Sequence, residues 1–318
     1  MAIISVVPPL NALLGRLRLR QLLLVVAIGE LSSLRKAADR VGISQPAATK
    51  MLAELEAALG VPLFERGRRG MVATAYGTAL IRHAHLVISD VGAMRDEIAG
   101  LASGTAGRLA IGMITAAAAG PLSIAVAQLK RRRPRLDVTI TVETSDILIP
   151  MLEQGRLDVV IGRRVPSDQA ADLEFTEIGP ERLSVVTGAA NPLRDRSDLT
   201  LPALGSEAWI LQPRTSPLRQ MVEAAFRDAG METPANVIET ASILTATTLL
   251  QHSDMVAVVP HSVALHYVSS GMMAILPVGL SRELDPYGVL TRKARARMPV
   301  LAELMALIPR EPNHEVKI

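Results

Sequence analysis

Basic side chains are concentrated in the first seventy residues, although the whole chain carries a net charge of only +3. Guanidinium and ammonium groups gathered in one segment are suited to binding the phosphates of a nucleic acid. The alternative is a basic face that contacts only solvent. These side chains are Arg16, Arg18, Arg20, Arg35, Lys36, Arg40, Lys50, Arg66, Arg68 and Arg69.

A second polar group lies further along the chain, where predicted strands end and helices begin. In open α/β sheets, ligands bind beyond the carboxyl ends of strands and close to helix N-termini. Hydroxyl, amide and guanidinium groups there suit a carboxylate or a polyhydroxy ligand. For each residue taken alone, a helix cap or a turn is the competing interpretation. The predicted effector-binding residues are Thr115, Thr144, Ser145, Arg163, Arg214, Thr215 and Ser216.

Motifs for catalysis are absent from the sequence. It has no phosphate loop, no dinucleotide-binding glycine fingerprint, no nucleophile elbow and no paired-histidine metal motif. His83 and His85 are two apart on a predicted helix and face different directions. Zero cysteines exclude disulfides and thiolate sites, and fit a reducing compartment. We expect no enzyme, no cofactor and no metal; an α/β enzyme is the weaker alternative.

Three helices are predicted to carry the N-terminal basic residues. Leucines at helical spacing predict a helix over about residues 19–29, and a second follows over about 34–41. Gly42 supplies the positive φ of a tight turn, and Ser44 is a good N-cap for a third helix that ends at Gly60. Two crossed helices of this kind form either a helix-turn-helix or an ordinary αα-hairpin.

A short hairpin over residues 63–72 follows, with arginines between glycines at its tip. Such a wing lets guanidinium groups reach phosphates or a minor groove. The run from Leu19 to Gly77 resembles the DNA-binding domain of the LysR-type transcriptional regulators. The resemblance rests on Ser44-Gln45-Pro46-Ala47, Leu55-Glu56, Leu59-Gly60, Leu63-Phe64-Glu65-Arg66 and Thr74-Ala75-Tyr76-Gly77.

The resemblance implies a sequence-specific regulator that binds double-stranded DNA through a winged helix-turn-helix at residues 16–74. It places Gln45, Pro46, Thr49 and Lys50 at the major groove and the wing arginines on the backbone. Lys50 stands where the family commonly has Arg, which puts a bidentate guanine contact there in question. The alternative is a helix-turn-helix regulator of another family with an unrelated sensor. The DNA-binding residues expected are Arg35, Ser44, Gln45, Pro46, Thr49, Lys50, Arg66, Arg68 and Arg69.

A linker helix is predicted over residues 75–104, because apolar residues alternate by four and three along it. That spacing is typical of a coiled-coil seam and predicts a homodimer; the alternative is a helix lying on its own domain. The resemblance implies antiparallel pairing of the linker helices, and pairing of dimers into tetramers. A glycine-rich hinge is expected at 102–107. The dimerisation residues expected are Leu80, Val87, Val91, Met94 and Ile98.

Strands and helices alternate over residues 107–310, which predicts an α/β domain with parallel sheets in two lobes. This part resembles the type-two periplasmic-binding-protein fold of the LysR effector domain. Short segments around Thr144, Leu157 and Ser253 are similar to the subgroup associated with sugar or aromatic-acid catabolism. The expected effector is therefore a sugar or an organic acid.

The first fifteen residues are expected to be disordered. They are apolar but contain Pro8 and Pro9, lack a basic start, and are too short to span a membrane. We therefore expect a cytoplasmic protein with no membrane partner.

Overall fold

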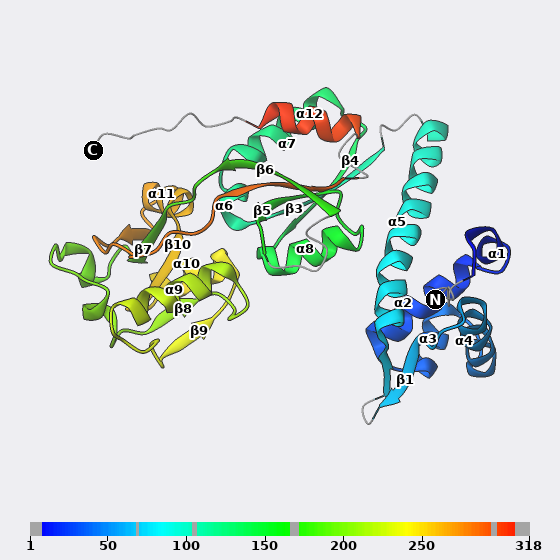
Figure 1. The fold of residues 1–318 in the computed structure, drawn as a ribbon. Coiled ribbons are helices and arrows are strands. Elements are labelled where there is room, and N and C mark those ends of the chain that lie inside the picture. The colour runs from blue at the N-terminus through cyan, green and yellow to red at the C-terminus, as the bar shows by residue number, and fades with distance from the viewer. Residues whose placement is uncertain (1–7, 68–69, 104–106, 166–171, 294–297, 309–318) are drawn as a thin grey trace, which may run out of the picture. The chain divides into compact units, whose positions relative to one another are not determined.

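The computed structural model describes residues 8–67, 70–103, 107–165, 172–293 and 298–308. The chain divides into two compact units near the end of its longest helix, at Ala99 and Gly100. Figure 1 labels the elements of both units. No helix among the described residues combines the length and the apolar character needed to cross a membrane.

The N-terminal unit is a small helical domain with a two-stranded wing. Its core contains Leu24, Ile28, Ala37, Leu55 and Leu63, which come from three helices and the start of the wing. The elements are α1 (Leu10–Leu14), α2 (Leu19–Leu31), α3 (Leu34–Val41), α4 (Gln45–Leu59), β1 (Phe64–Gly67), β2 (Gly70–Ala73) and α5 (Ala75–Ser103).

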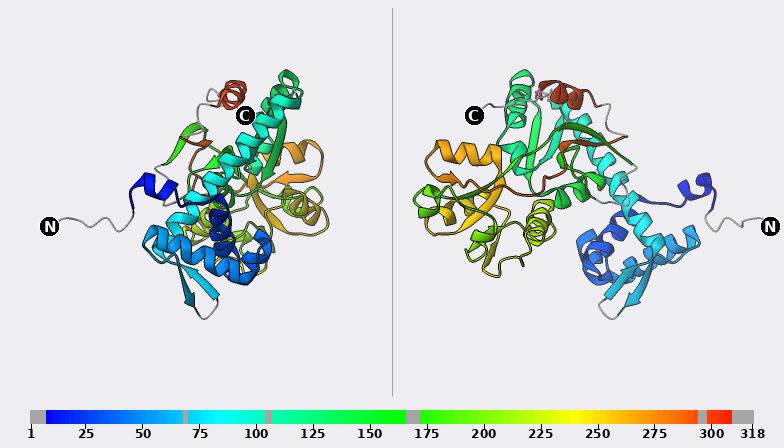
Figure 2. Two further views of the ribbon diagram at one scale, coloured as in Figure 1. Left: turned by 90° about the vertical axis from the view of Figure 1, so that its right-hand side faces the viewer. Right: turned by 60° about the vertical axis from the view of Figure 1, so that its left-hand side comes forward.

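One feature near the start of this unit differs from the sequence-based expectation. Leu10–Leu14 form the short helix α1 inside the segment expected to be disordered, and Leu13 packs against the core of the unit. The long helix α5 spans Ala75–Ser103, close to the bounds of 75–104 that the sequence predicts. Figure 2 shows α5 as one continuous helix from two further directions.

The second unit contains two lobes, each built on a five-stranded sheet. The first sheet has the order β4-β3-β5-β12-β6. Its core includes Ile111, Leu129, Leu148, Ile161 and Leu301. The elements of this lobe are β3 (Arg108–Met113), α6 (Thr115–Ala118), α7 (Pro121–Arg132), β4 (Asp137–Val142), α8 (Ser145–Glu153), β5 (Val159–Arg163), β6 (Leu173–Gly179), β12 (Tyr287–Arg292) and α12 (Pro299–Leu307).

The second lobe is inserted between β6 and β12, and its sheet has the order β11-β7-β10-β8-β9. Trp209 and Phe226 meet edge to face in its core, with ring centroids 5.2 Å apart. Its elements are β7 (Leu183–Gly188), β8 (Trp209–Leu211), α9 (Pro217–Asp228), β9 (Val237–Glu239), α10 (Ile243–Gln251), β10 (Val256–Pro260), α11 (His261–Ser269) and β11 (Met273–Ile275), with single 3-10 turns at Pro192–Asp195 and Pro202–Leu204.

Both sheets contain the expected parallel strands, but each also has antiparallel strands that the sequence did not predict. β3 pairs in parallel with β4 and β5, whereas β12 runs antiparallel to β5 and β6. In the second lobe, β7 is antiparallel to β10 and β11. The cause is the path of the chain, which passes from the first lobe to the second after β6 and returns before β12, so that the returning strand enters in the opposite direction (Figure 1).

Candidate DNA-binding surface and effector pocket

Helix α4 has a polar N-terminal face and an apolar face that joins the core. The Oγ of Ser44 accepts a hydrogen bond from the backbone N–H of Ala47 at 3.4 Å, as an N-cap does. Gly42 has φ +70° between α3 and α4, a left-handed conformation that glycine adopts without strain. The buried positions follow helical spacing and are Ala48, Leu52, Leu55 and Leu59.

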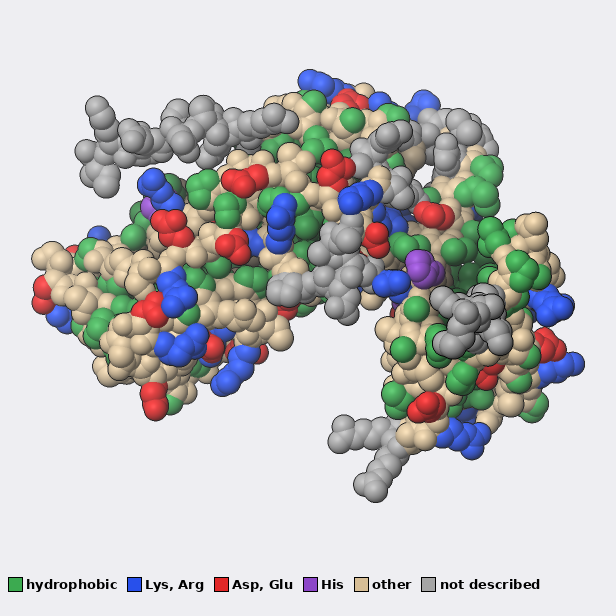
Figure 3. All heavy atoms as spheres, viewed as in Figure 1, with side chains coloured by type: hydrophobic (Ala, Val, Ile, Leu, Met, Phe, Trp, Pro, Cys, Tyr) green, Lys and Arg blue, Asp and Glu red, His purple; other side chains and the backbone are tan. Residues whose placement is uncertain are grey.

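The residues expected to bind DNA are exposed wherever the structure describes them. The Thr49 hydroxyl donates to the backbone carbonyl of Gln45 at 3.0 Å, and Lys50 Nζ lies 3.9 Å from Glu54 Oε1. Figure 3 shows Lys and Arg side chains on the surface of this unit. Arg68 and Arg69 lie outside the described residues. The exposed residues are Arg35, Ser44, Gln45, Pro46, Thr49, Lys50 and Arg66.

The wing is held against the end of α2 by backbone contacts. The N–H of Met71 donates to the carbonyl oxygen of Ser32 at 2.8 Å. Gly70 has φ +118°, and a Cβ there would lie 2.1 Å from the same Ser32 oxygen. Only glycine fits this approach, so the glycine beside the wing arginines has a structural role.

Glu56 ties the wing to α4, a role that sequence reasoning missed. Its Oε1 accepts hydrogen bonds from the backbone N–H groups of Leu63 at 2.8 Å and Phe64 at 3.3 Å. The carboxylate thereby satisfies two amides at the start of β1, which fixes where the wing leaves α4.

The linker helix α5 exposes most of its predicted seam. Val87, Val91, Met94 and Ile98 are between 38% and 59% exposed. Leu80 differs, because it is half-buried and packs against the core of the N-terminal unit. An exposed apolar row of this kind along one helix is suited to packing against a partner helix. Leu80 can contribute less to such a contact, because part of its side chain is already buried in the N-terminal unit.

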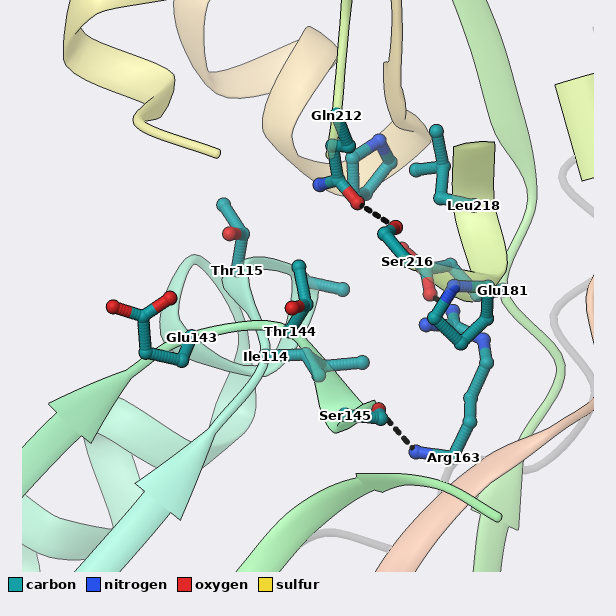
Figure 4. Close-up of a pocket in the computed structure, with 13 residues that line it drawn as sticks. Ile114, Thr115, Glu143, Thr144, Ser145, Arg163, Glu181, Gln212, Ser216 and Leu218 are labelled. Atoms are coloured by element: carbon teal, nitrogen blue, oxygen red, sulfur yellow. Dashed lines mark hydrogen bonds and ion pairs between the residues drawn. The ribbon is translucent and has the colours of Figure 1, made fainter. Parts of the chain in front are cut away.

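A polar pocket lies between the two lobes of the second unit, with about 340 Å³ of space including the part open to solvent. Figure 4 shows its side chains converging from strand ends of both lobes. A second hollow adjoins it and shares Thr115, Gln212 and Pro260. The pocket is lined by Ile114, Thr115, Ala116, Glu143, Thr144, Ser145, Arg163, Glu181, Gln212, Ser216, Pro217, Leu218 and Pro260.

Arg163 is buried in this wall and contacts both segments that cross between the lobes. Its guanidinium forms an ion pair with Glu181, which lies between β6 and β7, and its Nε donates to the carbonyl of Asp285 at 3.1 Å. Its backbone N–H donates to Ser145 Oγ at 2.9 Å. Burial lowers the pKa of Arg163 to about 10, against the opposing effects of Tyr287 and Asp285, so the guanidinium stays protonated at neutral pH.

Gln212 and Ser216 form the wall on the side of the second lobe. The Ser216 hydroxyl donates to Gln212 Oε1 at 2.5 Å, and the Ser216 Oγ also caps α9 by accepting a hydrogen bond from the backbone N–H of Arg219 at 3.4 Å. Arg219 is itself buried and paired with Glu223 at 2.6 Å. The orientation of Gln212 is thus fixed by Ser216.

The side-chain hydroxyl of Thr144 stands out among the polar groups of the pocket wall. It is 7% exposed, and its Oγ1 has no hydrogen-bond partner among the described residues. A buried hydroxyl without a partner loses the hydrogen bonds that water would give it. In a pocket wall, that cost is removed when a ligand supplies the partner.

The sequence-predicted effector residues divide into two groups. Arg214 and Thr215 are exposed and are not part of the wall. Sequence reasoning missed Glu143, Glu181 and Gln212, each of which lies next to or near a predicted junction. Those that the structure brings together in the pocket are Thr115, Thr144, Ser145, Arg163 and Ser216.

A winged helical unit joined by a long helix to a two-lobed domain with a polar pocket defines a class of DNA-binding proteins that respond to small molecules. The family model described as a bacterial regulatory helix-turn-helix protein of the lysR family matches residues 19–78, and the LysR substrate binding domain matches residues 102–312. The chain belongs to the LysR family of transcriptional regulators. It is a transcription regulator with a DNA-binding and an effector-binding domain, not an enzyme.

Individual relatives agree with this assignment. The chain is 37% identical to the HTH-type transcriptional regulator GbpR of Azospirillum brasilense over 90% of this chain and 84% of that protein. Among solved structures it resembles CbnR, a LysR family transcriptional regulator, with a TM-score of 0.60 at 25% identity over 92% of this chain and 98% of that one. Full-length BenM gives a TM-score of 0.52 at 25% identity, covering 93% and 100%.

Proposed function

We propose that a small polar effector, a sugar or an organic acid of catabolism, binds in the interlobe pocket and thereby alters the affinity of the chain for its operator. The protein acts as a cytoplasmic homodimer, with dimers pairing into tetramers. The observation that carries the proposal is the buried Thr144 hydroxyl, which lines a wall of polar groups and has no hydrogen-bond partner among the described residues.

The operator is read by the N-terminal end of α4, and the wing holds the DNA backbone. Gln45 is exposed at this end and carries an amide, which can pair with two atoms of adenine in the major groove. Arg66 is exposed on β1, where its charge can neutralise a phosphate. Arg35 on α3 and Lys50 on α4 add positive charge on the same unit.

Assembly through α5 is supported by the exposed apolar row from Val87 to Ile98. Burying such a row in a dimer removes apolar surface from water. A dimer also presents two recognition helices, which suits an operator with two half-sites.

The experiment begins with an operator selected from a random DNA library by the purified full-length protein. Small molecules that co-purify with the protein are identified by mass spectrometry, and each is tested for its effect on operator affinity. Thr144→Val keeps the shape of the side chain and removes the hydroxyl. We expect Thr144→Val to lose the effector response and to keep operator binding without effector.

Thr248→Val is the matched control, because Thr248 is exposed on α10 and does not line the pocket. An effector response of wild-type size in Thr144→Val would place the effector elsewhere. Loss of the response in both variants would also contradict the proposed site.

A further inference from the structure

We infer that the interlobe pocket selects neutral polyhydroxylated ligands over carboxylates, and that Glu143 sets this preference. The inference rests on the proposed function, because it takes the interlobe pocket to be the effector site, and it narrows the effector to one chemical class. It follows from the charges and the unused hydrogen-bonding groups in the wall.

The ionisable side chains in the wall are Glu143, Arg163 and Glu181. Arg163 and Glu181 neutralise each other, and both are more than nine-tenths buried. Because the Arg163 Nε is also engaged by the Asp285 carbonyl, two of the three guanidinium nitrogens contact protein groups. The guanidinium is therefore a poor candidate for the bidentate clamp that a carboxylate ligand needs.

Glu143 is the unbalanced charge of the pocket. It is half-buried at the end of β4 and forms no ion pair with any residue that the structure describes. In Figure 4 it lies on the opposite side of the pocket from Arg163. The wall therefore carries one net negative charge, which would repel a ligand carboxylate in a partly desolvated site.

The neutral groups of the wall complement ligand hydroxyls. A carboxylate accepts several hydrogen bonds and donates none, so Glu143 suits the O–H groups of a diol. Within the described part of the chain, the hydroxyl of Thr144 has no hydrogen-bond partner, and the Gln212 amide nitrogen remains available once the amide oxygen has accepted from Ser216. The adjoining hollow adds Ile210 and Val259, apolar surface for the C–H groups of a sugar.

Helix N-termini also affect the preference between neutral and anionic ligands, because they favour anions. Two helices, α8 and α9, begin at the pocket. Each helix end is equivalent to only about half a unit charge, which falls off within the first turn. Glu143 carries a full unit charge. The formal charge therefore exceeds either helix end and about equals the two together, whose effect is confined to the first turn of each helix.

The test is calorimetric titration of the full-length protein with a panel of aldopentoses and aldohexoses and, for each, the aldonate with the same carbon skeleton. We expect wild type to bind at least one aldose ten times or more tightly than its aldonate. Glu143→Gln removes the charge and keeps the shape, and it should reduce this preference by tenfold or more. Glu283→Gln is the control, because Glu283 is exposed and outside the wall.

A wild-type preference for an aldonate, or an unchanged preference in Glu143→Gln, would overturn the inference. Failure of every aldose and every aldonate to bind would overturn it as well. Titration of Thr144→Val distinguishes failure of this inference from failure of the proposed function. If an aldonate binds best and Thr144→Val still abolishes that binding, the pocket stands as the effector site and only the charge selection fails.

Discussion

The Glu56 carboxylate of α4 lies 2.8 Å from the backbone nitrogen of Leu63, at the point where the wing begins. The helix that we propose reads bases and the hairpin that we propose holds phosphates are thereby joined by one side chain. On this proposal, base reading and backbone binding both depend on the position that Glu56 gives the wing.

Glu56→Ala should lower both the stability of the N-terminal unit and operator affinity. It leaves the N–H groups of Leu63 and Phe64 without their acceptor, which costs about 1–3 kcal/mol for a partly buried group. Urea unfolding and operator titration measure the two effects. Glu56→Gln keeps the acceptor oxygen and should lose less of both; equal losses in the two variants would contradict this role.

Gln45→Ala should cost about 1–3 kcal/mol on the selected operator and much less on random DNA. The reason is that a base-edge contact carries sequence information, whereas phosphate contacts do not. Fluorescence anisotropy with both DNAs measures the difference. Equal losses on the two DNAs would show that Gln45 does not read bases.

Arg66→Ala should flatten the dependence of log affinity on log salt by about one unit, on operator and random DNA alike. Removing one phosphate contact releases one fewer counterion on binding. Titrations at several salt concentrations give the slope. If the slope does not change, the wing does not contact the DNA backbone at this residue.

Met94→Asp should weaken the dimer, since it places a charge in the apolar row of α5. Burying that carboxylate without a partner costs several kcal/mol. Sedimentation across a range of concentrations measures the assembly state. Thr78→Asp is the control on the same helix, at an exposed position away from the row. An unaltered assembly state in Met94→Asp would exclude the row as the dimer contact.

Arg163→Ala should destabilise the second unit by about 3–5 kcal/mol, because Glu181 would be left buried without its partner. The double variant Arg163→Met with Glu181→Leu removes both charges and should recover much of this loss. Unfolding can be monitored by the fluorescence of Trp209, the single tryptophan. A double variant as unstable as Arg163→Ala would contradict the ion-pair explanation.

Local signals explain what the sequence predicts well. Ser44 and Gly42 mark the start of α4 and the turn before it, and both roles depend on residues within a few positions. The rule that ligands bind at strand ends also leads to the interlobe pocket, because Thr115 and Thr144 each lie two residues after the end of a strand. That rule applies within a single sheet, so it does not predict which residues of the two lobes face each other.

Interactions between distant segments explain what the sequence could not predict. Arg163 and Glu181 meet because the chain crosses between the lobes. Nothing in the sequence around either residue indicates that the two form an ion pair. The antiparallel entry of β12 has no signature in the strand itself. Arg214 differs from these cases, since a basic residue two positions before a capping serine remains exposed and does not line the pocket.

The position of β12 between β5 and β6 has a consequence for synthesis of the protein. The first lobe begins at Arg108 but lacks an interior strand until Tyr287–Arg292 have left the ribosome. The core also awaits Leu301 and Leu304 of α12. The N-terminal unit and the inserted lobe can gather their strands and helices during translation. The interlobe pocket is therefore completed only when the chain is almost fully made, and a truncated product keeps its helix-turn-helix without a complete effector-binding domain.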